Sequence, residues 1–174
     1  MEQDLQQDRW ASGVFAMEGI SVLADQSLTM SLREHPFARN LDPTHIESLV
    51  QCSRECTIAA GDYLWRQGGH ADFFYLIYSG QAALEIAIPH EGILRIENVG
   101  EGEVLGWYWL LPSCRWNVDA RAITPVHALR VEGKLLRQKC GMDSSLRLAM
   151  LEKFALVITQ RLLTMQARLI HAVS

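Results

Sequence analysis

The protein has 174 residues and a mass of 19.7 kDa, the size of one domain with a long terminal element. Apolar residues make up 49% and charged residues 21%, which excludes a disordered, collagen-like or disulfide-stapled chain. No run of about 18 uncharged apolar residues occurs, so no membrane span is predicted. The first ten residues are acidic and lack an apolar core, unlike a signal peptide, and we expect a cytoplasmic protein.

The net charge of −4 is unevenly distributed along the chain. Up to Glu132 there are 9 basic and 18 acidic residues, whereas residues 133–174 hold 7 basic and 2 acidic residues. The acidic body should repel nucleic acid, and the dispersed basic residues favour a basic helix packed beside that body. We expect the four cysteines to be free thiols, because no secretion signal is present. A metal centre at Cys52 and Cys56 is not expected either, since it would need further ligands nearby.

The N-terminal part of the chain is predicted to be helical. Residues 1–31 form an N-terminal extension with a weak, loosely packed helical pattern. Asp42 followed by Pro43 then favours a helix start, since Asp is a good N-cap and Pro suits the first helical position. The following apolar residues have the spacing of a short amphipathic helix, and they are Ile46, Leu49 and Val50.

Residues 32–132 are predicted to contain a β-roll. From Cys56 onward, short runs of β-forming residues alternate with glycine turns. The predicted strands cover 63–66, 73–78, 81–88, 93–99, 117–123 and 127–132. This spacing indicates a mainly β protein with flanking helices, whose roll is a double-stranded β-helix or jelly roll.

Residues 133–174 change to helical periodicity. A short helix over 134–140 is expected to end at Gly141, and Asp143 or Ser144 to cap a long second helix. A heptad a/d pattern predicts a dimerisation seam on the long helix, formed by Leu148, Leu151, Ala155, Ile158, Leu162, Met165, Leu169 and Ala172. A second apolar line consists of Met150, Phe154 and Val157.

A helix with two apolar faces needs two covering surfaces. The simplest arrangement packs the second line on the β-roll and pairs the seam with a second copy, which predicts a homodimer. Arg161 and Arg168 fall at g positions that suit the flanks of a parallel pair. The alternative is that both faces are buried within one chain.

This order of elements resembles the cyclic-nucleotide-binding domain of the catabolite activator (CRP/FNR) class. Four strings carry the resemblance, and they are Ala60-Gly61-Asp62-Tyr63-Leu64 with Gln67-Gly68, Phe74 to Gly80, Gly102-Glu103-Val104-Leu105-Gly106, and Arg121-Ala122. The third resembles the start of the family's phosphate-binding cassette and the fourth its end. The resemblance implies a regulatory protein rather than an enzyme, with a cyclic nucleotide as the family's usual ligand.

The polar anchors of that cassette are absent here. In the family, a glutamate after the glycine binds the ribose and an arginine pairs with the phosphate. Here the glycine is Gly106, Trp107 takes the glutamate position and Trp116 the arginine position. Arg115 lies one place away, and Asn117 stands at the neighbouring hydroxyl position. We therefore expect weak or no binding of cyclic AMP or cyclic GMP in the usual pose, and no other cofactor.

An aromatic pattern replaces the anchors and resembles a subgroup of stand-alone domains without a DNA-binding module. The candidate ligand-binding residues are Gly106, Trp107, Tyr108, Trp109, Arg115, Trp116 and Asn117. Two interpretations stand. Either the aromatic rings form a flat pocket for a different, less charged ligand, or they fill the cassette as core.

The chain ends at Ser174, where the family continues into a helix-turn-helix, so we expect no direct DNA binding and an output through a partner protein. The histidines are scattered and no hydrolase or nucleotide P-loop pattern occurs, which favours neither a metal site nor an enzyme. We expect a small-ligand sensor that signals through the dimer helix. The alternatives are a ligand-independent interaction module and, more distantly, a cupin-like metalloenzyme.

Overall fold

The structure, a computed structural model, describes residues 22–111 and 114–172. Its helices are α2 (Val22–Glu34), α3 (Pro43–Val50), α4 (Gly133–Met142) and α5 (Ser144–Ala172), with short 3-10 turns η1 (Pro36–Ala38) and η2 (Trp107–Leu110). Its strands are β1 (Ser53–Ile58), β2 (Tyr63–Trp65), β3 (Phe73–Ser79), β4 (Ala82–Ile88), β5 (Gly92–Val99), β6 (Val104–Leu105), β7 (Asp119–Ala122) and β8 (Val126–Glu132). Within the described ranges, no helix combines the length and the apolar composition that crossing a bilayer requires.

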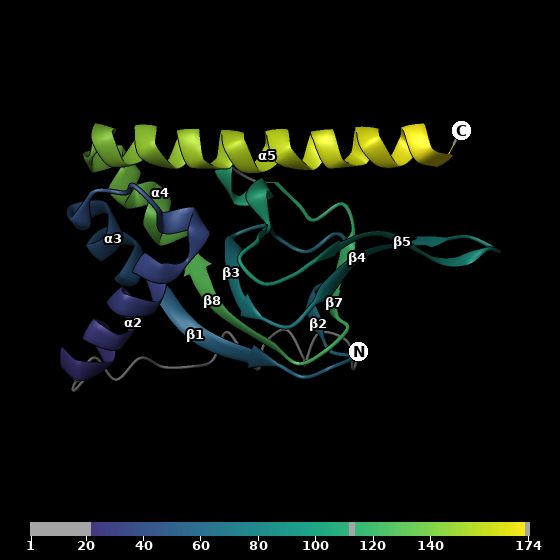
Figure 1. Cartoon of the computed structure of the whole chain (residues 1–174), viewed down its shortest axis with the longest axis horizontal. Helices are drawn as coiled ribbons and strands as arrows, with labels where there is room; N and C mark the ends of the chain where they lie inside the picture. The colour runs from purple at the N-terminus through teal and green to yellow at the C-terminus, as the bar shows by residue number, and fades with distance from the viewer. Residues whose placement is uncertain (1–21, 112–113, 173–174) are drawn as a thin grey trace.

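The strands form two four-stranded antiparallel sheets, in the orders β1-β8-β3-β6 and β2-β7-β4-β5. Apolar side chains fill the roll, among them the fully buried Ile77, Leu105 and Ala120. Helices α2, α3 and α4 gather at one end of the roll, and α5 runs along one side of it (Figure 1). The predicted mainly β jelly roll with flanking helices is confirmed.

Two strands escaped the sequence analysis. Strand β1 shows no clear apolar alternation, because it carries the charged residues Arg54 and Glu55. It pairs with β8 along its whole length. Strand β6 has only two residues, too few to show a period. Both pair with sheet partners that are far away in the sequence, which a local pattern cannot reveal.

The helices before the roll follow the predicted capping. The Asp42 carboxylate accepts a hydrogen bond from the Thr44 backbone N–H at 2.9 Å, which caps α3. The predicted stripe of α3 is buried, as expected. Helix α2 continues across the predicted boundary at residue 31, and its Leu32 is fully buried in the core. The first part of the predicted extension, 1–21, lies outside the described residues.

The two C-terminal helices join at Asp143. The prediction that Gly141 ends the first helix is wrong, because α4 stays helical to Met142 and the chain becomes extended only at Asp143. The Asp143 carboxylate then accepts hydrogen bonds from the backbone N–H groups of Ser145 and Leu146, at 2.9 and 3.1 Å. Asp143 therefore caps α5, as one of the two predicted alternatives states.

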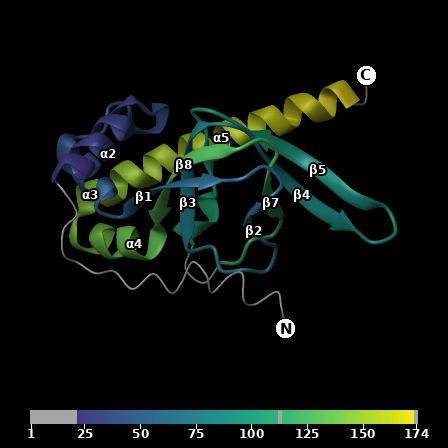
Figure 2. The same cartoon turned by 90° about the horizontal axis from the view of Figure 1, so that it is seen from below.

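Helix α5 packs one face on the rest of the molecule. Leu146, Met150 and Phe154 are almost completely buried in the core, which agrees with the second apolar line predicted for this helix. Farther along, α5 passes over the roll and ends near the β4–β5 hairpin, which projects from the body (Figures 1 and 2). Here Arg168 Nη1 donates to the Ile96 carbonyl at 3.1 Å, so the helix is tied to β5 over its last turns.

Candidate functional site: a cavity between the aromatic cassette and α5

The cassette backbone turns sharply at Gly106. This residue follows β6 and has φ +99°, a left-handed conformation that favours glycine over any residue with a Cβ atom. The short turn η2 begins directly after it with three consecutive aromatic residues. The three rings divide between two roles, because Trp107 and Tyr108 stack on each other and line a cavity while Trp109 turns into the core.

Trp109 belongs to the core. Its side chain is 2% exposed and packs on the rings of Phe74 and Phe154, with centroids 5.2 and 5.3 Å away. Its backbone is fixed as well, since Arg137 of α4 donates a hydrogen bond to the Trp109 carbonyl. The indole Nε1 is buried and has no hydrogen-bond partner among the described residues. For this ring the structure supports the filled-core interpretation.

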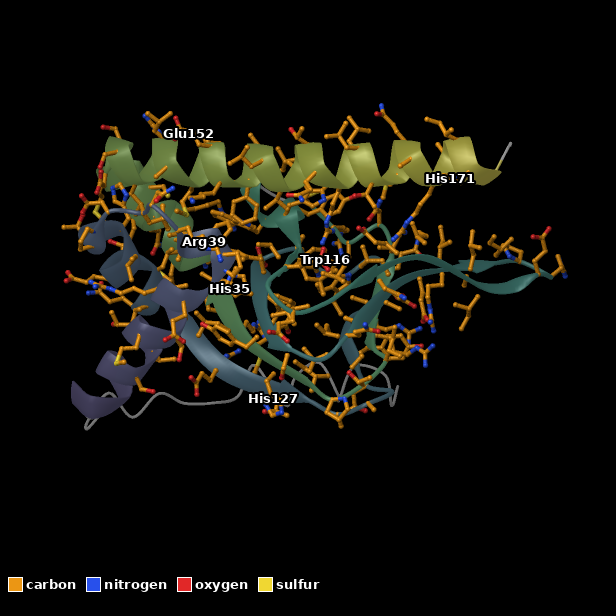
Figure 3. All side chains as sticks on the ribbon, in the orientation of Figure 1. His35, Arg39, Trp116, His127, Glu152 and His171 are labelled. Carbon is orange, nitrogen blue, oxygen red and sulfur yellow. The ribbon has the colours of Figure 1, made fainter. Side chains whose placement is uncertain are left out.

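Trp116 also points inward, from the loop before β7. It is 3% exposed and stacks on Trp65, with ring centroids 4.0 Å apart and planes 14° from parallel. Trp65 is itself fixed, because its Nε1 donates to the Val118 carbonyl at 2.9 Å. Figure 3 shows Trp116 on the side of the roll that faces α5. One wall of the cassette is thus a stack of two indoles at the arginine position inferred from the family resemblance.

Trp107 and Tyr108 form a second aromatic pair, and both side chains are only half-buried. Their ring centroids are 4.0 Å apart, with planes 20° from parallel. Burial raises the pKa of the Tyr108 hydroxyl, and a hydrogen bond with Asn117 opposes this shift. Trp107, Tyr108 and Asn117 all line a cavity, so part of the aromatic cassette is open rather than filled.

The cavity has a volume of about 240 Å³ and lies between the roll and α5. Its walls are mostly apolar. The cassette contributes Gly106, Trp107, Tyr108, Trp116 and Asn117, while α5 contributes Ile158, Arg161, Leu162 and Met165. A hollow of this size, with few polar groups among aromatic walls, has the character of a small-molecule site.

Two predicted site residues stand apart from this cavity. Arg115 is exposed, and its Nη1 donates to the Gly68 carbonyl at 2.6 Å, so its guanidinium holds the β2–β3 loop. Trp109 is turned into the core. The structure therefore brings five of the seven candidate ligand-binding residues to the cavity and leaves Arg115 and Trp109 outside its lining.

The cavity also contains a charge pair that the sequence analysis missed. Glu97 of β5 is 5% exposed and its Oε2 lies 3.8 Å from Nη1 of Arg161, whose side chain is 13% exposed. The Arg161 Nη2 donates to the Val104 carbonyl at 2.5 Å. Burial lowers the pKa of Arg161, which the negative charge of Glu97 opposes. The heptad g position of Arg161 predicts that its side chain flanks a second helix. In the structure the side chain faces the roll instead.

The seam residues of α5 divide between cavity and surface. Leu148, Leu151 and Leu169 are exposed by 58%, 51% and 67%. Leu162 and Met165 are also exposed, but they form part of the cavity wall at the same time. The apolar surface of α5 is therefore continuous with the mouth of the cavity.

The remaining polar groups form no metal centre in the part of the chain that the structure describes. There, no group of three or more His, Cys, Asp or Glu side chains lies close enough to hold an ion. The four cysteines are free thiols, as predicted.

Comparison with known proteins agrees with this geometry. The family model of the cyclic nucleotide-binding domain matches residues 55–143, which is half of the chain and includes the roll, the cassette and α4. Among curated proteins, isozyme 1 of the cGMP-dependent protein kinase of Drosophila melanogaster is 23% identical over 122 residues, covering 70% of this chain. The chain spans about 15% of that kinase, so the likeness concerns one domain of it.

Solved structures share the fold. A cyclic nucleotide-binding domain from Methylobacillus flagellatus KT superposes with a TM-score of 0.71 at 17% identity, covering 86% of this chain and 84% of that one. The sensor domain of the transcriptional regulator DNR from Pseudomonas aeruginosa superposes with a TM-score of 0.64 at 22% identity, covering 80% and 93%. At these identities the likeness establishes the architecture, and the cavity residues of this chain must be judged by themselves.

Proposed function

The chain belongs to the cyclic nucleotide-binding domain family, and from this membership we propose that it is a non-enzymatic regulatory protein that senses a small ligand other than a cyclic nucleotide. One observation carries the proposal. A single cavity is lined on one side by the aromatic cassette and on the other by α5. A ligand that fills it contacts both elements at once, and can therefore change the position of α5 relative to the roll.

The altered specificity follows from the charges around the cassette. The arginine position inferred from the family resemblance holds Trp116, which is stacked on Trp65, and the nearest alternative, Arg115, is engaged with Gly68. A phosphate at that arginine position would meet indole rings, and the guanidinium that does line the cavity, Arg161, is already paired with Glu97 and bonded to the Val104 carbonyl. Burying an anion without a free cationic partner costs on the order of several kcal/mol. The usual pose of a cyclic nucleotide is therefore unfavourable.

The output proposed for this sensor is the exposed seam of α5. Leu148 and Leu151 precede the cavity residues on the same helix and expose apolar side chains. Exposed apolar residues at heptad spacing are typical of a helix that pairs with a second helix. We expect a homodimer through α5, with the ligand biasing how the two helices meet and a partner protein reading the change.

A second candidate function is a ligand-independent interaction module. The observation in its favour is the burial of Trp109 and Trp116, which fill two parts of the cassette with the protein's own rings. In that case the dimer surface of α5 is the only functional feature, and the remaining cavity is a packing gap.

A thermal-shift screen separates the two candidates. The test compounds are cyclic AMP, cyclic GMP and a set of uncharged aromatic metabolites, each at about 100 µM, where a ligand with a Kd near 1 µM adds about 2.7 kcal/mol of stability. The variant Ile158→Trp fills the cavity from α5, and Leu156→Trp is its control, because Leu156 is 66% exposed on the same helix and outside the cavity lining.

If the protein is a sensor, at least one aromatic compound should raise the melting temperature of the wild type and of Leu156→Trp but not that of Ile158→Trp. If the protein is a ligand-independent interaction module, no compound should raise the melting temperature in this way. A rise of several degrees with cyclic AMP or cyclic GMP would contradict the altered specificity.

A further inference from the structure

The charge pair in the cavity has an incomplete set of hydrogen bonds. Glu97 is 95% buried, and its Oε2 accepts no hydrogen bond among the described residues. The distance of 3.8 Å between Oε2 and Arg161 Nη1 is too long for a hydrogen bond, although the two charges attract. A buried carboxylate oxygen without a donor is costly, because it has lost water and gained no replacement.

A second contact holds Arg161 at this distance from Glu97. Its other terminal nitrogen, Nη2, is held by the Val104 carbonyl at 2.5 Å, and Val104 lies in β6 directly before the cassette turn. The guanidinium is therefore anchored with one edge toward the sheet and Nη1 toward Glu97. A donor and an acceptor thus stand side by side in the cavity, the donor on α5 and the acceptor on β5.

The aromatic walls around this charge pair favour a flat ligand. Trp107 and Tyr108 contribute one stacked aromatic pair and Trp65 and Trp116 another. Flat rings pack favourably on such faces. A dry cavity of roughly 150 Å³ holds a benzene molecule, so the volume of about 240 Å³ here has room for one or two fused rings.

The charges of Glu97 and Arg161 also restrict the charge of the ligand. Glu97 and Arg161 are neutral as a pair, so the attraction of a charged ligand to one member is offset by its repulsion from the other, and the cost of removing that charge from water is not compensated. An uncharged ligand with a donor next to an acceptor avoids this cost and can form hydrogen bonds with both members of the pair, since both residues line the cavity.

We propose that this cavity binds an uncharged planar heteroaromatic compound whose ring N–H donates to Glu97 and whose adjacent carbonyl oxygen accepts from Arg161, in other words a ring with a lactam edge. The inference rests on the proposed sensor function and names the ligand class of the same cavity. It assigns Glu97 and Arg161 as the specificity-determining residues, in place of the missing phosphate and ribose anchors.

The test uses a matched pair of probes on the intact wild-type protein. 2-Quinolinone carries the N–H and carbonyl edge on two fused rings, and N-methyl-2-quinolinone has the same rings and carbonyl but no donor. By isothermal titration calorimetry we expect 2-quinolinone to bind about tenfold more tightly or better, since N-methyl-2-quinolinone cannot form the hydrogen bond to the charged acceptor.

Variants then assign the effect to the carboxylate. Glu97→Gln keeps the size of the side chain but replaces the charged acceptor by a neutral amide, and should reduce the discrimination between the probes. Glu101→Gln is the control, because Glu101 is exposed on the turn before β6. The probe pair alone keeps the test valid if Glu97→Gln fails to fold.

Two results would overturn the proposal, and they differ in what they say of the sensor function. Equal binding of both probes, unchanged in Glu97→Gln, means that the cavity takes aromatic ligands without reading a lactam edge, and the sensor function stands. Absence of binding by both probes up to about 1 mM also overturns the ligand class. The sensor function itself fails only when no compound discriminates between Ile158→Trp and Leu156→Trp.

Discussion

The indole of Trp116 lies directly against the backbone of Gly106. A Cβ atom on Gly106 would come within 3.0 Å of Trp116 Cη2, and within 3.3 Å of the Phe73 carbonyl oxygen. Gly106 also has φ +99°, so its lack of a side chain serves both the turn and the close approach of the ring. The concave side of the cassette turn is therefore occupied by the protein itself at this point, and the open space lies farther toward α5.

The first prediction concerns this contact. Gly106→Ala should lower the free energy of unfolding by about 2–4 kcal/mol, because the left-handed backbone costs about 1–2 kcal/mol for a residue with a Cβ atom and the clash with Trp116 adds to it. Urea denaturation followed by circular dichroism measures the change. Gly61→Ala is the matched control, since Gly61 has φ +91° with nothing within 4 Å of a Cβ atom.

A double mutant identifies the source of the extra cost. In a Trp116→Phe background the Cη2 atom is gone, so the cost of Gly106→Ala should fall toward that of Gly61→Ala. If both glycine substitutions cost the same in the wild type, the ring does not press on the turn as the structure shows.

Much of the fold could be predicted because its signals are local. Asp42 and Asp143 cap helices in the way that a short polar side chain before an apolar helical pattern indicates. Six of the eight strands were predicted because glycine turns, and Thr124-Pro125 before the last strand, separate them. The second apolar line of α5 is also visible in the sequence, since a buried helix face repeats with the helical period. Gly141 was misjudged because a glycine weakens a helix without always ending it.

The candidate site could be predicted only in part, for a physical reason. Gly106 and the aromatic residues are contiguous, so the cassette can be found from a string. Glu97 and Arg161 meet across 64 positions of sequence, and each has an ordinary local explanation, a strand residue for one and a heptad g position for the other. The second apolar line predicts that Met150 and Phe154 turn toward the body, but it does not show that this orientation brings Arg161 against Glu97 of a distant strand.

The second prediction separates core rings from cavity rings. Trp109→Ala should destabilise the protein by about 3–5 kcal/mol, because a fully buried aromatic ring leaves a large cavity. Trp109→Phe should cost clearly less, since the buried Nε1 makes no hydrogen bond within the part of the chain that the structure describes. Trp107→Ala should cost less than Trp109→Ala, because the Trp107 ring is only half-buried. Equal losses for Trp107→Ala and Trp109→Ala would contradict the division between cavity wall and core.

The third prediction concerns the seam of α5. Introducing charge at two exposed seam positions, in the double variant Leu148→Glu and Leu151→Glu, should convert the expected dimer to a monomer, since buried carboxylates at a helix interface are strongly unfavourable. Sedimentation velocity or light scattering gives the mass. Leu135→Glu is the control, because Leu135 is 47% exposed on α4 and outside the seam. A monomeric wild type, or a double variant that stays dimeric, would refute pairing through this part of α5.

The last prediction is a pH dependence that arises from His35 at the junction of α2 and the roll. The side chain is 3% exposed, accepts a hydrogen bond from the Phe37 N–H at Nδ1, and bonds the Ile77 carbonyl through Nε2, so the neutral ring satisfies both partners. Burial lowers the pKa of His35 below its ordinary value of 6.5, with the Ile77 carbonyl opposing the shift. The unfolded chain therefore binds a proton more readily than the folded one, and this residue destabilises the fold as the pH falls through about 6.5 toward the folded pKa.

Urea denaturation from about pH 8 to pH 5 should show the wild type losing more stability than His35→Gln, whereas His127→Gln, at an exposed position, should keep the wild-type slope. A wild type and a His35→Gln variant with parallel pH profiles would mean that the proton does not distinguish the folded from the unfolded chain at this residue.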